Sequence, residues 1–154
     1  MTRIDRIGHV VLHVRDPFAS ADWYRDVLGM EVVVESKEFN GVFLSFGTSD
    51  HDIALFKAPD GGGQGGRDLN HVAFEFGGSL DEYKAVHANL VAKNVEITAV
   101  VDHGISYGTY FLDPDGHTLE IFWPRIPNDG TSKQMMMAEI GAIADPVDLA
   151  GVTE

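Results

Sequence analysis

Two histidines occupy the same place in two similar segments of the chain. His9 is the third residue of Ile7–Leu12 (Ile-Gly-His-Val-Val-Leu), and His71 is the third residue of Leu69–Phe74 (Leu-Asn-His-Val-Ala-Phe). The offset between them is 62 residues (71 − 9). Imidazoles are metal ligands and proton carriers, so a duplicated histidine is a candidate for chemistry. The chain is therefore interpreted as a duplicated module with one histidine contributed by each copy.

A second pair of segments adds a carboxylate to this set. His51–Phe56 resembles His117–Phe122 at an offset of 66 residues (117 − 51), and the later copy contains Glu120. Two imidazoles and one carboxylate form a mononuclear non-haem metal site with open positions, which suits Fe(II), Mn(II) or Zn(II). The repeat thus predicts a metal centre held by His9, His71 and Glu120.

The elements that must position these residues also repeat. Alternating and β-branched residues predict strands, Asp16-Pro17 and the Ser79-x-x-Glu82 capping box predict helix starts, and Gly29 predicts a helix end. In the first module we expect strands at 7–14, 30–36, 42–46 and 52–57; in the second we expect strands at 69–76, 95–101, 109–112 and 118–123. Each module therefore has the order βαβββ, with its helix after its first strand.

These modules predict an α+β fold. Residues 1–124 form one domain of two modules, 4–58 and 69–124, joined by a glycine-rich linker at 60–66 and followed by a tail at 125–154. Side chains alternate between the faces of a strand. If the two sheets curl into one open barrel of antiparallel and mixed strands, the three ligands can converge on a metal from three strands.

Composition excludes several classes of function. The 154-residue chain has a formal net charge of −13, so nucleic acid and anionic membrane surfaces are poor partners. It has no cysteine, which excludes disulfides, thiolate ligands and a cysteine nucleophile. No signal peptide and no bilayer-spanning apolar run is recognised, so we expect a soluble, cytoplasmic protein.

From Ile4 to Pro124 the pattern resembles the vicinal oxygen chelate superfamily, whose fold is paired βαβββ modules around a metal. The superfamily includes glyoxalases, epimerases, fosfomycin-resistance transferases, bleomycin-binding proteins and extradiol dioxygenases. Glyoxalases and related epimerases usually carry a fourth ligand in the last strand of the first module. The residue there, matched from Glu120 by the offset of 66, is Ala54, which cannot ligate. This argues against those two classes, but not against the transferases.

Three further residues lie in segments that resemble those of the extradiol ring-cleavage dioxygenases. Ser49–Ala54 is similar to the strand that carries the acid–base histidine of these enzymes, which is His51 here. Asp102–Ile105 is similar to the loop whose histidine approaches the catechol, which is His103 here. The run from His103 through Tyr110 to Glu120 follows the family signature, except that Thr109 replaces an apolar residue. Taken alone, each of these residues has an ordinary structural explanation; together with the three ligands they favour catalysis.

The resemblance implies an Fe(II) enzyme, sometimes Mn(II), that cleaves a catechol with O2 to a muconic semialdehyde-type product. His51 would stabilise the reduced oxygen species and donate a proton, while His103 and Tyr110 would bind substrate oxygens. Other metal enzymes of the superfamily, such as a fosfomycin-type transferase or a glyoxalase-like lyase or isomerase, stay open as alternatives, as does a small-molecule-binding resistance protein without turnover. A homo-oligomer is expected, because a one-domain form could close its cavity with a partner or with its tail.

Overall fold

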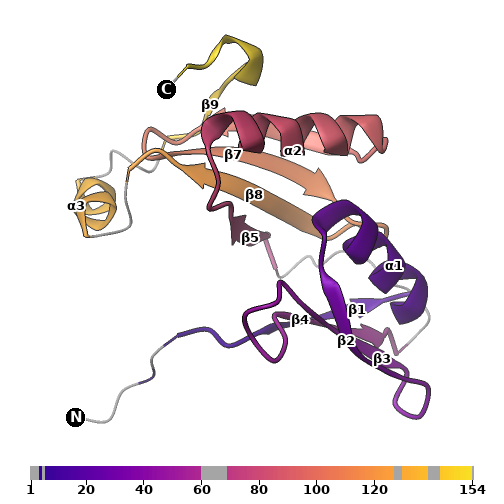
Figure 1. Cartoon of the computed structure of the whole chain (residues 1–154). Helices are drawn as coiled ribbons and strands as arrows, with labels where there is room; N and C mark the ends of the chain where they lie inside the picture. The colour runs from indigo at the N-terminus through magenta and orange to yellow at the C-terminus, as the bar shows by residue number, and fades with distance from the viewer. Residues whose placement is uncertain (1–3, 5, 60–68, 127–129, 139–142, 154) are drawn as a thin grey trace. The chain divides into compact units, whose positions relative to one another are not determined.

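The computed structural model describes residues 4, 6–59, 69–126, 130–138 and 143–153, so the linker predicted at 60–66 lies outside the described residues. The chain divides into two units, each with its own sheet (Figure 1). Unit 1 is Met1–Gly65 together with Pro114–Gly116, and unit 2 is Gly66–Asp113 together with His117–Glu154. Each unit is described by itself.

Unit 1 has the predicted order βαβββ. Its elements are β1 (Val10–Val14), α1 (Pro17–Leu28), β2 (Glu31–Ser36), β3 (Gly41–Ser45) and β4 (Ile53–Lys57). The sheet order is β1-β4-β3-β2, with β1 parallel to β4 and the other neighbours antiparallel. The Asp16 carboxylate accepts hydrogen bonds from the first turn of α1, and Gly29 ends the helix at φ 70°, a conformation that suits glycine.

Unit 2 repeats this order and adds a strand from the tail. Its elements are β5 (Val72–Glu75), α2 (Leu80–Ala92), β6 (Ile97–Asp102), β7 (Ser106–Leu112), β8 (Thr118–Pro124), α3 (Thr131–Met137), β9 (Asp145–Pro146) and the 3₁₀ turn η2 (Leu149–Gly151). The sheet order is β5-β8-β7-β6-β9, and Figure 1 shows α2 lying along this sheet. The capping box of Ser79 and Glu82 is present at the start of α2.

The strand registers reproduce the internal repeat residue by residue. Val11 pairs with Ala54 in unit 1, and Ala73 pairs with Glu120 in unit 2. The second strand of each module is also interrupted at the same point, between Val32 and Val34 in β2 and between Ile97 and Ala99 in β6. Ala54 is therefore the structural counterpart of Glu120, as the sequence offsets predicted.

Each core contains the apolar side chains of one helix and its sheet. In unit 2, Leu119 and Ile121 of β8 are buried in this core, so Glu120 between them points to the opposite face of the sheet. The largest fully buried side chains are Tyr24, Met30, Leu44, Ile53 and Leu55 in unit 1, and Leu80, Tyr83, Leu90, Phe111 and Leu119 in unit 2.

The α+β class and the two modules are confirmed, with one correction. Hydrogen bonding divides the strands between two sheets, so they do not close into the single barrel expected from the sequence. The reason is local, because each module pairs its first strand with its own fourth strand. Among the described residues, no helix combines the length and apolar character needed to cross a bilayer.

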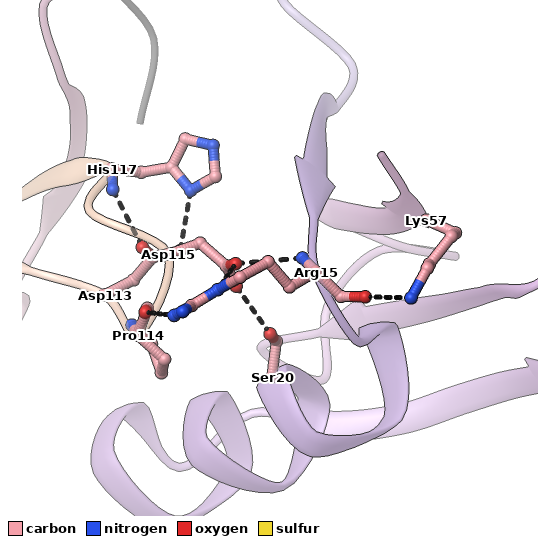
Figure 2. A network of polar contacts seen from close by, with 7 residues as sticks. All are labelled: Arg15, Ser20, Lys57, Asp113, Pro114, Asp115 and His117. Carbon is pink, nitrogen blue, oxygen red and sulfur yellow. Dashed lines mark hydrogen bonds and ion pairs between the residues drawn. The ribbon is translucent and has the colours of Figure 1, made fainter. Parts of the chain in front are cut away.

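The β7–β8 turn carries a buried carboxylate that belongs to unit 1 (Figure 2). Asp115 accepts hydrogen bonds from the backbone N–H and Nε of Arg15, both at 2.9 Å, and from the Ser20 hydroxyl at 2.9 Å. The side chain of Asp115 is 1% exposed. Arg15 also donates to the Pro114 carbonyl and accepts from Lys57. The carboxylate thus ties the turn to the start of α1.

Candidate active site

In unit 2 a histidine and a glutamate face each other across the ends of two paired strands. His71 precedes β5, Glu120 lies in the neighbouring strand β8, and the His71 Nε2–Glu120 Oε2 distance is 3.2 Å. The Glu120 side chain is only 7% exposed. His71 Nδ1 lies 2.7 Å from Asn70 Oδ1, which can only accept, so Nδ1 carries the hydrogen. Nε2 is then the ring nitrogen that faces the Glu120 carboxylate, on the side where a metal would bind.

A glycine in β7 makes room for this carboxylate. Gly108 is buried, and a Cβ atom at that position would overlap Glu120 Oε1 and press on the Tyr110 ring. Any larger residue would force the Glu120 side chain away from its position in the structure. Gly108 therefore fixes where the carboxylate can lie.

Two further predicted residues gather at the same pair. His103 Nε2 lies 3.1 Å from the Tyr110 hydroxyl oxygen and 3.8 Å from Glu120 Oε1. The Tyr110 ring contacts His71 edge-on, with ring centroids 5.2 Å apart. Burial, and then the Glu120 charge, raise the pKa of Tyr110 to about 12. The hydroxyl therefore stays protonated at neutral pH and can donate a hydrogen bond.

Unit 1 brings its two predicted histidines together. The rings of His9 and His51 have centroids 4.4 Å apart, and the Phe43 ring meets His51 edge-on at 5.0 Å. Phe43 in turn contacts Phe39 and Phe56, at 6.0 and 5.9 Å. His51 Nδ1 lies 3.4 Å from Asp50 Oδ1, and the His51 side chain is 18% exposed. The result is an aromatic surface with two imidazoles at one end.

The donor set in unit 2 fits a first-row metal ion. Neighbouring ligands about 2.1 Å from such an ion and at a right angle lie about 3 Å apart, close to the 3.2 Å between His71 Nε2 and Glu120 Oε2. Within the described parts of the chain, no three His, Asp or Glu side chains form a cluster that could hold a metal. Unit 2 therefore supplies two donors, and the third predicted ligand, His9, belongs to unit 1.

The structure thus assembles the predicted residues as two groups. His71, His103, Tyr110 and Glu120 meet in unit 2, while His9 and His51 meet in unit 1. Sequence reasoning missed Asn70 and Gly108, and it did not identify which residue of the tail contacts the site. Asn70 stands next to a predicted ligand and Gly108 two residues before Tyr110, so their positions in the sequence could have drawn attention to them.

A model of the Glyoxalase/Bleomycin resistance protein/Dioxygenase superfamily matches residues 6–121. The chain belongs to this superfamily. That match covers both βαβββ modules except the end of β8, and it includes every residue of the candidate site. The resemblance inferred from the sequence is therefore confirmed.

Two curated relatives from Rhodococcus globerulus are named as dioxygenases. Biphenyl-2,3-diol 1,2-dioxygenase 3 is 34% identical over 164 residues, which covers 97% of this chain and 83% of the relative. Biphenyl-2,3-diol 1,2-dioxygenase 2 is 32% identical over 127 residues, covering 79% of this chain and 64% of the relative. At this similarity the chain is related to proteins that are named as dioxygenases.

Solved structures of lower identity share the fold. A glyoxylase/bleomycin resistance protein/dioxygenase domain from Frankia sp. EAN1pec matches with a TM-score of 0.66 at 22% identity, over 80% of this chain and 100% of that one. A genomically encoded fosfomycin resistance protein from Listeria monocytogenes matches with a TM-score of 0.62 at 20% identity, over 79% of this chain and 94% of that one. At these identities the likeness extends to the fold alone.

Proposed function

We propose that the protein is an Fe(II)-dependent extradiol dioxygenase that cleaves a catechol-type ring with O2. The proposal assigns His9, His71 and Glu120 as metal ligands and His51, His103 and Tyr110 as catalytic residues. The product would be a muconic semialdehyde-type acid in which both oxygen atoms of O2 are retained. That reaction balances without an external reductant, because the four-electron reduction of O2 is matched by oxidation of the ring carbons.

The observation that carries the proposal is the contact of His103 and Tyr110 with the His71–Glu120 pair. A hydrolytic or transferase site of the same superfamily needs the metal ligands but has no evident use for a histidine and a protonated tyrosine beside them. Ring cleavage does need them, since both hydroxyls of a catechol must be bound. The names of the two curated relatives support the same activity.

The residues of unit 2 would bind and orient the catechol. Bound Fe(II) would supply a site where catechol and O2 meet and would make the catechol hydroxyls more acidic. Tyr110, whose pKa is about 12, would donate a hydrogen bond to one substrate oxygen, and His103 would bind the other. Holding the ring in one orientation supplies much of the rate, because the reacting atoms no longer have to find each other.

The residues of unit 1 would transfer a proton during the reaction with O2. His51 is the proposed proton carrier, because its imidazole can both accept and donate near neutral pH. Its ring lies against His9, the ligand proposed from the same unit, and is mostly shielded from solvent. The neighbouring Phe43 is apolar and would help to exclude water from the reacting oxygen atoms.

A glyoxalase-like activity is the alternative that the site disfavours most directly. It would be expected to use a fourth protein ligand at the counterpart of Glu120, and that counterpart is Ala54, which is fully buried and has no donor atom. A three-ligand site leaves more open positions on the metal, which suits the binding of two reactants.

The test is anaerobic loading with Fe(II), followed by a catechol and then O2. We expect yellow ring-opened product with Fe(II), weaker or comparable activity with Mn(II), and none with Zn(II) or without metal. His71→Ala is the matched control, since it removes one proposed ligand from a half-exposed position. Absence of product from simple and biaryl catechols with Fe(II)-loaded protein would contradict the proposal.

A further inference from the structure

The C-terminal tail returns to the sheet of unit 2 beside a proposed catalytic residue. Its strand β9 pairs antiparallel with the end of β6, joining Asp145 to Asp102 and Pro146 to Val101. Just before β9, the backbone carbonyl oxygen of Ile143 lies 2.5 Å from His103 Nδ1. This contact joins residues 40 positions apart, and the internal repeat contains no counterpart for it.

The chemistry of this contact determines which nitrogen of the His103 ring carries the hydrogen. A carbonyl oxygen can only accept, so His103 Nδ1 must be the donor. In a neutral imidazole the other nitrogen, Nε2, then carries the lone pair and can only accept. That nitrogen is the one 3.1 Å from the Tyr110 hydroxyl and 3.8 Å from Glu120 Oε1. The tail therefore determines which kind of hydrogen bond His103 can make at the candidate site.

We propose that the Ile143 carbonyl is a positioning group that holds His103 in its Nδ1–H tautomer, with Nε2 as an acceptor facing the substrate position. This inference rests on the proposed function for the identity of the substrate. In the free protein the donor to Nε2 is the Tyr110 hydroxyl, 3.1 Å away. An arriving catechol hydroxyl would replace it as the donor to Nε2, which frees the Tyr110 hydrogen for the other substrate oxygen. The two residues would then divide the work, with Tyr110 as hydrogen-bond donor and His103 as hydrogen-bond acceptor.

The tail is anchored firmly enough to act in this way. After β9, the Val147 N–H donates to the Val100 carbonyl at 3.1 Å, and Leu149 is buried at 5% exposure. Lys84 of α2 donates to the Val152 carbonyl at 2.5 Å. These contacts fix the path of the chain on the C-terminal side of Ile143.

His103 is also held in place by the turn between β6 and β7 in which it lies. The His103 backbone N–H donates to the Ser106 carbonyl at 2.9 Å, which closes a tight turn between β6 and β7. Asp102 accepts from the Gly104 N–H at 2.6 Å and from Arg125 at 2.9 and 3.0 Å. Gly104 adopts φ 77°, so the turn suits glycine there. With both partners fixed, the hydrogen bond between them sets the ring orientation.

The tautomer can be measured without metal, substrate or turnover. In metal-free protein labelled with nitrogen-15 histidine, long-range proton–nitrogen correlation spectra at about pH 8.5 distinguish the two neutral tautomers of each ring. We expect the His103 signals, identified by their loss in His103→Gln, to be those of the Nδ1–H form. The Nε2–H form in wild-type protein would overturn the inference, whatever the enzyme's activity.

Two truncations separate the carbonyl from the rest of the tail. A chain ending at residue 142 lacks Ile143, whereas a chain ending at Val147 keeps Ile143 and β9; both lose Leu149 and Val152. We expect the shorter chain to show a mixture of His103 tautomers and the longer chain to keep the Nδ1–H form. Retention of one tautomer in both folded truncations would contradict the inference; if the shorter chain does not fold, the wild-type spectrum still decides.

Kinetics of the Fe(II)-loaded truncations then test the role in catalysis. If the carbonyl positions His103 for substrate, the chain ending at 142 should show a KM for catechol at least tenfold above that of the chain ending at 147, with equal iron content. Equal KM values for the two truncations would show that the tautomer does not matter to substrate binding. Failure of both to turn over, with the expected spectra, would count against the proposed function and not against the tautomer.

Discussion

At the scale of single residues, the candidate site depends on the space around Glu120 as much as on its charge. The carboxylate lies over Gly108, and its Oε2 is 3.2 Å from His71 Nε2. The far end of a glutamate is flexible, so a side chain at residue 108 would displace the carboxylate without unfolding the sheet. Metal binding is therefore expected to be more sensitive to this glycine than folding is.

Gly108→Ala should weaken metal binding while leaving the fold intact. We expect a loss of about 10–100-fold in Fe(II) or Mn(II) affinity, the usual cost of moving a ligand away from its position. Gly77→Ala is the control, because a Cβ there meets nothing within 4 Å. Titration calorimetry under anaerobic conditions measures the affinities, and circular dichroism checks the fold. Equal affinities for the two variants would contradict the account.

His51→Ala should retain metal and lose most turnover. A positioned acid–base group contributes about 10²–10⁴-fold to rate, so kcat should fall within that range while iron content is unchanged. His13→Ala, an exposed histidine of β1, should stay within about twofold of wild type. Steady-state kinetics and iron analysis check both. Turnover of His51→Ala at the wild-type rate would remove this residue from the mechanism.

At the scale of elements, the β7–β8 turn combines a tight bend with a buried carboxylate that is paired with the exposed Arg15 (Figure 2). Within unit 2, Asp113 accepts from His117 Nδ1 at 2.8 Å and from its backbone N–H at 2.8 Å, which closes the turn. Within unit 1, Asp115 accepts from Arg15 and Ser20. Buried donors left without their acceptor cost more than an exposed pair contributes.

Asp115→Ala should therefore destabilise the protein by about 2–4 kcal/mol, because it leaves the Ser20 hydroxyl and an Arg15 N–H without their carboxylate. Asp22→Ala is the matched control. Asp22 pairs with Arg25 at 2.8 Å, but both side chains are more than half exposed, so its loss should change stability by less than about 0.5 kcal/mol. Urea denaturation measures both. Similar midpoints for the two variants would contradict the assigned role of Asp115.

Helix α2 carries a histidine whose charge state is linked to stability. His87 lines a cavity of about 490 Å³ together with Val100, Asp148 and Leu149. Burial lowers its pKa below the ordinary 6.5, against the opposing effect of Asp148. The unfolded chain therefore binds a proton more readily than the folded chain does. The contribution of His87 is present above about pH 6.5 and is lost as pH falls through the lower folded value.

His87→Gln should reduce this pH dependence. The difference in urea midpoint between pH 7.5 and pH 5 is expected to be smaller in the variant, since contributions of the other histidines cancel in the comparison with wild type. Denaturation curves at the two pH values measure it. If the difference in urea midpoint is the same in His87→Gln as in wild type, His87 titrates alike in the folded and unfolded chains.

At the scale of the whole molecule, the repeat made much of the structure predictable. The helix signals at Asp16, Gly29 and Ser79 are local, so they fixed α1 and α2 closely, and the offset of 66 residues correctly matched Ala54 to Glu120. Two sheets were expected, but whether they close into one barrel was not predictable, because closure depends on strand partners distant in sequence. The contact of Ile143 with His103 was hidden for the same reason, since the tail has no counterpart in the repeat.

The most direct test of the central claim is the stoichiometry of O2 consumption. Fe(II)-loaded protein is mixed with a limiting amount of 2,3-dihydroxybiphenyl in an oxygen electrode, and ring-opened product is quantified in the same sample. We predict one O2 consumed for each catechol cleaved, with no O2 returned when catalase is added. No uptake above the protein-free rate, or recovery of O2 after catalase, would contradict the assignment as an extradiol dioxygenase.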